Sequence, residues 1–251
     1  MPLFTVITVV YNDYEGLKKT LASVTEQSCN DDFEYIVVDG QSTDNTISLL
    51  EDNRAITKFI SEKDYGIYDA MNKGITLSSG QWIIFLNAGD VFYDKKSLHR
   101  VEKNISEVGP DVNFMFGKYL SGGVEYDQDL NIQFLTSHMI NHQSIFYHRN
   151  LFNNSKFSID YKYCADYKHL IDNYTYIVAK KMDFIVSIFD NNGISSQAIN
   201  KYKMWLERLR GIWNSNLSLK TKVKMSKRGM FALPYQFVRS KLILTGVLRE
   251  K

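Results

Sequence analysis

Residues 61–90, SEKDYGIYDAMNKGITLSSGQWIIFLNAGD, contain the pattern that decides the fold. Within this stretch, WIIFL (82–86) is a continuous apolar run without alternation, which is typical of a central strand covered on both faces. The run stops abruptly at the polar segment NAGD (87–90). Ligands bind beyond the carboxyl ends of the strands in open α/β sheets, so the segment predicts a buried strand followed by a binding loop. The alternative is a polar turn that only caps the next helix.

The rest of the first hundred residues alternates strand and helix patterns. Apolar, β-rich runs predict three more strands at 3–10, 35–38 and 57–60. Helical periodicity follows, with Asp13 as the predicted N-cap of a helix that runs to Gln27, and Ser42 or Thr43 as the cap of the next. Repeated βα units with short connections predict the α/β class, with a doubly wound, mostly parallel central sheet.

Composition and charge place the chain among soluble globular proteins. Of the 251 residues, 44% are hydrophobic and 23% are charged, which is ordinary for such proteins. No apolar stretch approaches the roughly 20 residues that span a membrane, and the N-terminus lacks a signal-peptide pattern. Cys29 and Cys164 offer neither a disulfide framework nor zinc-site spacing. We therefore expect a cytoplasmic protein.

Polar side chains end three of the predicted strands. They are Asn12 and Asp13, then Asp39, then Asn87 and Asp90. The first turn lacks the glycine-rich phosphate motifs of dinucleotide oxidoreductases and P-loop NTPases, which argues against both classes. Carboxylates repel phosphates unless a cation such as Mg²⁺ or Mn²⁺ lies between them. These strand ends therefore predict a nucleotide diphosphate bridged by a divalent metal.

Five segments give the chain a specific resemblance. They are TVITVVYN (5–12), TLASVTEQ (20–27), EYIVVDGQSTDNT (34–46), SEKDYGIYDAMNKGI (61–75) and GQWIIFLNAGD (80–90). Together they resemble family 2 glycosyltransferases with the GT-A fold, in particular the bacterial enzymes that build colanic acid, O-antigen and capsule polysaccharides. The resemblance implies transfer of a sugar, with inversion, from a nucleotide-diphosphate sugar, usually UDP-linked. It also implies a saccharide acceptor carried on a polyprenyl diphosphate.

The resemblance also implies roles for individual residues in the first hundred. Asp39 matches a carboxylate that contacts uracil, and Asp64 is a second candidate for a base or ribose contact, or a solvated loop acid. The loop 87–90 stands where the family keeps an Asp-x-Asp-type motif, but Asn87 replaces the first carboxylate and Gly89 occupies the middle position. Asp90 is retained, and we assign it to the metal. The predicted nucleotide-sugar-binding residues are Val10, Asn12, Asp39, Asp64, Asn87 and Ala88.

Two further candidates lie in the second half of the chain. The His142–Gln143 pair before an apolar strand resembles this subfamily. Near a diphosphate, His142 could ligate the metal or donate to a phosphate oxygen, because neutral imidazole and its N–H suit both tasks, and the alternative is a structural histidine. Asp166 matches the acidic residue that serves as general base. Inversion by a single displacement requires such a base for the acceptor hydroxyl, whereas the alternative is an acid favoured by a helix dipole. Strands are also predicted at 111–120 and, as a pair, within 176–189.

Charge divides the chain into an acidic body and a basic end. Residues 201–251 contain thirteen Lys/Arg and two acidic residues, a net charge of +11, against −9 for the first 200 residues. We therefore predict a catalytic domain over 1–214 and a basic helical tail over 215–251. Basic clusters beside apolar segments favour an anionic membrane surface, here the inner face of the cytoplasmic membrane, where the protein would be peripheral. Solvated helices packed on the body are the alternative, and no motif accompanies the charge that would indicate nucleic acid.

A second function class stays open from the sequence. Asn87 stands where a carboxylate is expected, so the chain could instead be a non-catalytic subunit that binds a nucleotide sugar. Retention of Asp90 and Asp166 favours the enzyme.

Overall fold

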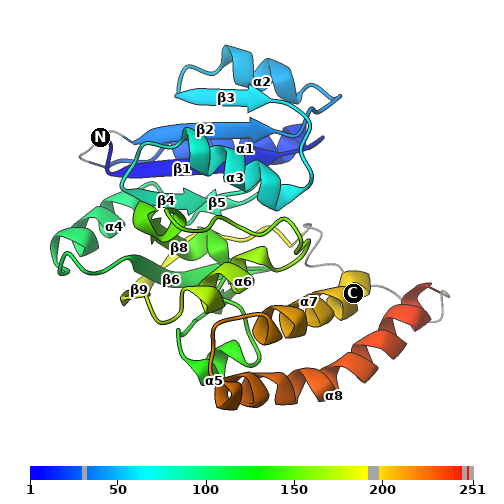
Figure 1. Cartoon of the computed structure of the whole chain (residues 1–251). Coiled ribbons are helices and arrows are strands. Elements are labelled where there is room, and N and C mark those ends of the chain that lie inside the picture. The colour runs from blue at the N-terminus through cyan, green and yellow to red at the C-terminus, as the bar shows by residue number, and fades with distance from the viewer. Residues whose placement is uncertain (30–32, 192–197, 245–247, 249–251) are drawn as a thin grey trace. The chain divides into compact units, whose positions relative to one another are not determined.

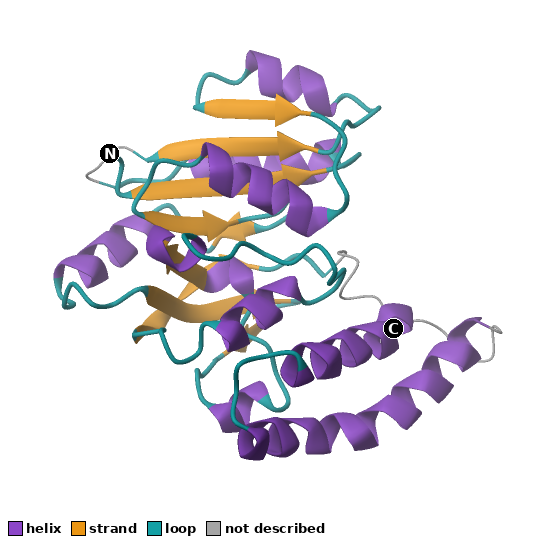
Figure 2. Cartoon of the chain, viewed as in Figure 1, coloured by secondary structure: helices purple, strands orange, loops and turns teal. Residues whose placement is uncertain are grey.

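The computed structural model describes residues 1–29, 33–191, 198–244 and 248. They form two compact units. The first comprises 1–128, 141–157 and 176–190; the second comprises 129–140, 158–175 and 191–251. Residues 215–251, the predicted tail, thus belong to the same unit as the segments 129–140 and 158–175. The catalytic domain that ends at residue 214 stays a prediction. Figure 1 labels the elements, and Figure 2 distinguishes helices from strands.

The first unit is built on one sheet, in the order β3-β2-β1-β4-β8-β6-β9-β5, with β7 paired to β6. The strands are β1 (Phe4–Val10), β2 (Glu34–Asp39), β3 (Lys58–Ser61), β4 (Trp82–Phe85), β5 (Val91–Phe92), β6 (Phe114–Ser121), β7 (Val124–Tyr126), β8 (Ile145–His148) and β9 (Ala179–Ile188). Strands β3, β2, β1 and β4 lie side by side and run in the same direction (Figure 1). The register aligns Val10 with Asp39, so the carboxyl ends of β1 and β2 are level. The predicted α/β architecture is confirmed.

The second half of the sheet adds pairings that the sequence did not predict. Strand β8 is antiparallel to both β4 and β6, whereas β9 runs parallel to β6. The predicted pair of strands within 176–189 is wrong. This segment forms the single strand β9, because its partners are the distant strands β6 and β5 rather than a neighbouring hairpin arm.

The described part of the first unit contains the α-helices α1 (Tyr14–Thr25), α2 (Thr46–Asp52), α3 (Ile67–Leu77) and α4 (Ser97–Ser106), and two short 3-10 turns (His142–Ser144 and Arg149–Phe152). Asp13 caps α1 as predicted, and its carboxylate accepts the Gly16 N–H at 3.0 Å. The predicted cap of α2 is wrong, because Asn45 is the N-cap and makes no side-chain capping bond. Ser42 and Thr43 instead bond to the strand ends described below.

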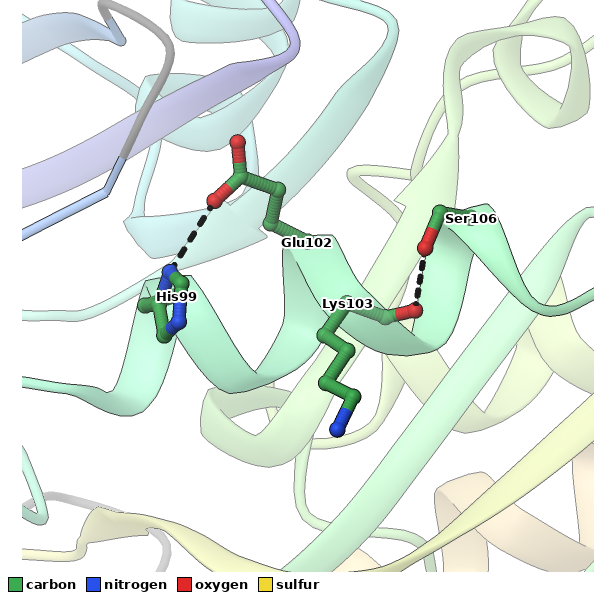
Figure 3. Close-up of a pocket in the computed structure, with 4 residues that line it drawn as sticks. All are labelled: His99, Glu102, Lys103 and Ser106. Carbon is green, nitrogen blue, oxygen red and sulfur yellow. Dashed lines mark hydrogen bonds and ion pairs between the residues drawn. The ribbon is translucent and has the colours of Figure 1, made fainter.

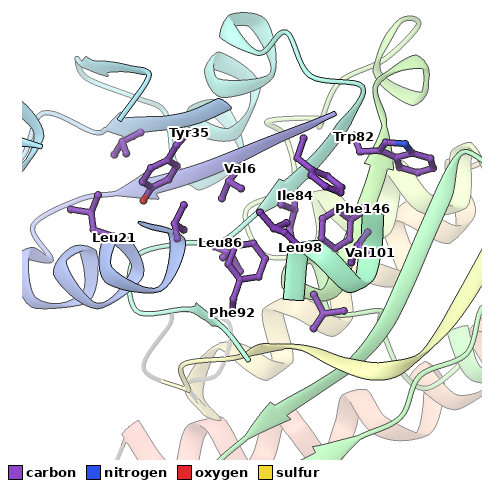
Figure 4. Close-up of a cluster of buried hydrophobic side chains, with 14 of the residues drawn as sticks. Val6, Leu21, Tyr35, Trp82, Ile84, Leu86, Phe92, Leu98, Val101 and Phe146 are labelled. Atoms are coloured by element: carbon purple, nitrogen blue, oxygen red, sulfur yellow. The ribbon is translucent and has the colours of Figure 1, made fainter. Parts of the chain in front are cut away.

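The core of this unit is apolar and continuous from β2 to β8. Tyr35, Val6, Ile84 and Phe146 come from four different strands and belong to one buried cluster (Figure 4). Every residue of β1, β2 and β4 is buried, as expected for strands covered on both faces. The position of each strand end is therefore fixed by close packing beneath it.

Glu34 ties the amino-terminal ends of these strands together. Its buried carboxylate accepts hydrogen bonds from Lys58 Nζ (2.8 Å), Thr5 Oγ1 (2.7 Å) and the Ser79 N–H (2.7 Å). Burial raises the pKa of Glu34, but the hydrogen bonds outweigh burial and leave the pKa below its usual value. The acid therefore stays ionised and fastens β1, β2, β3 and the turn before β4.

The second unit is helical in the part described. Its elements are α5 (Ile132–Leu135), α6 (Ala165–Asp172), a short 3-10 turn (Ala198–Asn200), α7 (Lys201–Trp213) and α8 (Leu219–Leu244). Arg208 of α7 is buried, and its guanidinium lies over the rings of Tyr167 and Trp205 at 4.8 and 4.4 Å. The same group donates to the carbonyl of Leu135 at 3.0 Å, which joins α5, α6 and α7. None of the helices formed by described residues has the length and apolarity required to cross a membrane.

Candidate functional site

The loops after β1 and β2 are bonded to each other. The Asn12 N–H donates to Ser42 Oγ at 2.7 Å, and the Thr43 N–H donates to Asn12 Oδ1 at 2.7 Å. Asn12 has φ +50°, a left-handed conformation that Asn adopts more readily than most residues. These hydrogen bonds therefore bring the ends of β1 and β2 together.

Asp39 is the anchor of the second loop. It is fully buried, and its Oδ2 accepts the Ser42 N–H at 3.0 Å and the Ser61 hydroxyl at 2.6 Å. Its Oδ1 accepts the Ser42 hydroxyl. The Gly40 N–H continues the ladder by donating to the Val10 carbonyl at 2.9 Å. Asp39 therefore shapes the turn, and direct contact with a base stays a prediction.

Asp64 and Tyr11 flank Gly40. A Cβ atom added to Gly40 would lie 2.5 Å from Asp64 Oδ2 and 3.3 Å from Tyr11 Cδ2. The absence of a side chain at position 40 thus leaves room for both. Tyr11 is 64% exposed, and an exposed aromatic ring beside an acid can stack on a flat ligand. Tyr11 was not among the residues predicted from the sequence, although it directly follows an apolar strand pattern.

Asp90 fastens the loop that follows β4. It is 2% exposed and accepts the N–H groups of Asp190 (2.9 Å) and Asn87 (3.2 Å) and the amide of Gln143 (2.8 Å). Burial raises the pKa of Asp90 to about 6, although these hydrogen bonds oppose the rise. With both oxygens engaged, the carboxylate holds the loop in place. A contact between Asp90 and a metal stays a prediction.

Two other residues restrict the same loop. Thr20 on α1 donates its hydroxyl to the Asp90 carbonyl at 2.8 Å and accepts the Gly89 N–H at 3.0 Å. The Ala88 N–H donates to the Val9 carbonyl at 3.1 Å, which continues the β1–β4 pairing into the loop. The backbone of 87–90 is therefore preorganised at the end of the sheet.

Asn87 and His142 meet, as the prediction of a common site requires. Asn87 Nδ2 lies 3.1 Å from His142 Nε2. The other amide atom, Asn87 Oδ1, is buried and has no hydrogen-bond partner among the residues that the structure describes. A buried acceptor without a partner costs free energy unless a ligand satisfies it. This oxygen therefore fits a cation or a ligand donor.

The described residues contain no group of three or more His, Cys, Asp or Glu side chains placed to hold a metal ion. Mg²⁺ is commonly bound by only one or two carboxylates together with substrate phosphates. The amide oxygen of Asn87 suits an ion of that kind, one that takes most of its ligands from oxygen atoms of a bound nucleotide. The residues present therefore fit a divalent cation that arrives with a diphosphate.

Asp166 belongs to the second unit. It lies in the first turn of α6, is 9% exposed, and accepts the Tyr167 N–H at 2.8 Å. Glu207 of α7 holds the preceding segment by accepting the N–H groups of Lys162 (2.9 Å) and Tyr163 (2.7 Å). The segment just before α6 is thus anchored to α7. Its role as a base stays a prediction.

A pocket on helix α4 includes none of the candidate residues. It is lined by His99, Glu102, Lys103 and Ser106, all on one helix, and His99 Nδ1 lies 3.3 Å from Glu102 Oε2 (Figure 3). One helix surface supplies every lining side chain, so this pocket carries no functional assignment.

Comparison with known proteins identifies the family. The model of the family described as Glycosyl transferase family 2 matches residues 5–168. A PGL/p-HBAD biosynthesis glycosyltransferase of Mycobacterium bovis (strain BCG / Pasteur 1173P2) is 36% identical over 158 residues, which are 59% of this chain and 60% of that relative. The match thus leaves about two fifths of the relative's length uncovered.

Solved structures agree on the fold. S. aureus TarS 1–349 in complex with UDP has a TM-score of 0.68 at 19% identity, over 90% of this chain and 70% of that one. The mannosyltransferase PcManGT from Pyrobaculum calidifontis, in complex with GDP-Man and Mn²⁺, has a TM-score of 0.70 at 16% identity, over 97% and 75%. The fold is that of the GT-A glycosyltransferases. Since the family match extends over more than half of the 251 residues, the chain belongs to glycosyl transferase family 2.

Proposed function

We propose that this chain is an inverting glycosyltransferase that transfers a sugar from a nucleotide-diphosphate sugar, with UDP as the nucleotide, to a saccharide acceptor. The observation that carries the proposal is the bonding of the β1 and β2 end loops through Asn12, Ser42 and Thr43. It joins two predicted nucleotide-binding segments into one surface. The UDP and the GDP-Man named for two proteins of the same fold support a nucleotide-sugar donor.

The donor would contact residues from four segments of the first unit, namely those after β1, β3 and β4 and the turn before β8. Tyr11 and Asp64 flank Gly40, where an aromatic face and a carboxylate suit a base and ribose hydroxyls. Asn87 and His142 offer polar groups to the diphosphate, and the metal roles proposed from the sequence belong to His142 and Asp90. A bound Mn²⁺ or Mg²⁺ would neutralise the diphosphate and stabilise its departure. The unpartnered Asn87 Oδ1 supports a ligand at this point.

Asp166 is the proposed general base. Single-displacement transfer needs a carboxylate that takes the proton of the acceptor hydroxyl as that oxygen attacks the anomeric carbon. Asp166 is 9% exposed, and the Lys162 and Tyr163 N–H groups just before it donate to Glu207, which anchors that segment. No protein nucleophile is required for this reaction.

A nucleotide panel tests the proposal. We expect UDP with Mn²⁺ to raise the melting temperature more than GDP, CMP or dTDP does, and more than UDP without the metal. At a hundredfold excess over the dissociation constant, the stabilisation is about 2.7 kcal/mol, or roughly 5–10 °C for a chain of this size. Scanning fluorimetry measures the shift. No shift with any nucleotide would contradict the proposal.

A non-catalytic nucleotide-sugar-binding subunit is the second candidate. Asn87 and Gly89 favour it, because the loop 87–90 offers only the buried carboxylate of Asp90. Both candidates give a UDP shift, but only the enzyme hydrolyses or transfers the donor sugar. Release of UDP from UDP-sugars, measured with and without saccharide acceptors, separates them.

The acceptor proposed is a saccharide on a polyprenyl diphosphate, used in bacterial surface polysaccharide synthesis at the inner face of the cytoplasmic membrane. Helix α8 supports a membrane contact. It exposes basic side chains together with apolar ones, namely Lys220, Lys224, Lys227, Arg228, Tyr235, Phe237, Val238 and Leu244. A helix of this composition suits an anionic lipid surface.

Vesicle sedimentation tests the membrane contact. We expect the protein to sediment with vesicles rich in phosphatidylglycerol, and a Lys224→Glu/Lys227→Glu variant to bind about thirtyfold more weakly, at about 1 kcal/mol for each basic residue. Lys18→Glu/Lys19→Glu is the matched control, because it reverses two exposed charges on α1. If the α8 variant and the control bound the vesicles equally well, the proposed membrane contact of α8 would be refuted.

A further inference from the structure

The loop after β4 has no side chain at position 89, and a residue from a distant part of the chain occupies the space. Gly89 has φ +95°, a conformation that side-chain-bearing residues rarely adopt. A Cβ atom added there would lie 2.7 Å from Asp190 Oδ2 and 3.3 Å from Asp190 Cγ. The carboxylate of Asp190 therefore lies where a side chain of residue 89 would begin.

The backbone of Asp190 is fixed at this place. Strand β5 pairs with β9 through Val91 and Ile188, which brings the end of β9 beside the loop. The Asp190 N–H then donates to Asp90 Oδ1 at 2.9 Å, and the Phe189 N–H donates to the Leu120 carbonyl at 2.8 Å. Because Asp90 is itself buried, the bond holds residue 190 to the core of the unit.

Asp190 and Asp90 differ in their exposure to solvent. Asp90 is 2% exposed and both of its oxygens accept protein hydrogen bonds. Asp190 is partly exposed, and its carboxylate adjoins the same loop from the strand β9 side. A ligand from solvent therefore reaches Asp190 more easily than Asp90.

We propose that Asp190 supplies the metal-facing carboxylate of the nucleotide-diphosphate site, in the place that residue 89 leaves open. The inference rests on the proposed function. Mg²⁺ takes only one or two carboxylates from a protein when phosphates complete its shell, and Asp190 supplies one of them. The buried, unpartnered oxygen of Asn87 lies in the same loop as Gly89, beside which the Asp190 carboxylate lies. The loop 87–90 then needs no carboxylate of its own on its exposed side.

Mn²⁺ binding in the presence of saturating UDP tests this inference. Free Mn²⁺ is followed by its electron paramagnetic resonance signal, and protein stability by the melting temperature without ligands. We expect Asp190→Asn to weaken Mn²⁺ binding at least tenfold, because it removes one charged ligand, and Asp190→Glu to retain most of the affinity. Since the Asp190 N–H is unchanged in both variants, we expect the ligand-free melting temperatures to match the wild type.

Asp183→Asn is the matched control. Asp183 also lies on β9, its side chain is 94% exposed, and the substitution removes the same charge without touching the loop. We expect this variant to bind Mn²⁺ as the wild type does. An equal loss in Asp183→Asn and Asp190→Asn would show a general charge effect and overturn the inference.

The outcomes separate this inference from the function on which it rests. If the wild type binds UDP with Mn²⁺ and Asp190→Asn binds both equally well, only the role of Asp190 is refuted. UDP binding that needs no metal refutes that role as well and leaves the nucleotide site standing. A wild type that binds no nucleotide contradicts the proposed function itself. A destabilised Asp190→Asn variant that Asp190→Glu does not restore would make Asp190 structural and also overturn the inference.

Discussion

Replacing Asp166 by Asn is expected to lower kcat about a thousandfold while leaving the nucleotide-dependent melting shift intact. A positioned general base contributes about 10²–10⁴-fold to a rate, and an amide cannot take the proton of an acceptor hydroxyl. Asn retains the size of Asp and can still accept the Tyr167 N–H through its carbonyl oxygen, so the first turn of α6 stays formed. The measurements are sugar transfer under single-turnover conditions and scanning fluorimetry with UDP and Mn²⁺.

Asp160→Asn provides the control for this experiment. Asp160 belongs to the same unit and is exposed, so its substitution removes an equal charge at a site with no proposed role. We expect its turnover to match the wild type. Near-wild-type turnover by a folded Asp166→Asn protein would exclude Asp166 as the base.

Removing the carboxylate of Asp39 is expected to have the second largest effect. Asp39→Ala leaves the Ser42 N–H and the hydroxyls of Ser42 and Ser61 without their buried acceptor. Each unsatisfied buried group costs about 1–3 kcal/mol. Some of these groups will find water, so we expect the free energy of unfolding to fall by about 3 kcal/mol. UDP binding should weaken more than tenfold, because the turn that carries Gly40 loses its anchor.

The Asp39→Asn variant separates the role of Asp39 in holding the turn from any role of its negative charge in binding UDP. Its carbonyl oxygen can accept from the Ser42 N–H and Ser61, and its amide can donate to the Ser42 hydroxyl, so most of the stability should be kept. If Asp39 contacts the base, as the sequence predicts, Asn should still weaken UDP binding about tenfold. Denaturant unfolding and UDP titration measure the two effects. Unchanged UDP binding in Asp39→Asn would limit Asp39 to its role in the turn.

The first half of the fold was predictable because its signals are local. The strand at 82–86 is an unbroken apolar run, and the helix after Asp13 has both a cap and an apolar stripe. The pattern that predicts each βα unit therefore lies within about twenty consecutive residues. The meeting of the loops at Asn12 and Asp39 followed from one rule, that parallel strands end at the same edge of a sheet.

The second half resisted prediction because its pairings join segments that are distant in sequence. The apolar residues of β9 fit a two-stranded hairpin equally well, but the strands that β9 pairs with are β6 and β5, more than fifty residues earlier in the chain. The place of Asp190 beside Gly89 depends on that pairing, so no local pattern could indicate it. The sequence also could not indicate that both Asp90 oxygens accept hydrogen bonds, because two of the three donors belong to the distant residues Gln143 and Asp190.

The bond between Asp90 and the Asp190 N–H also has a consequence for biosynthesis. A ribosome adds one hundred residues between these two, so a nascent chain can form the β1–β4 part of the sheet long before the loop after β4 acquires its last support. Contacts of such wide sequence separation form slowly, because a long loop must close before they are made. The loop 87–90 is therefore expected to reach its final conformation late, after most of the chain has been translated.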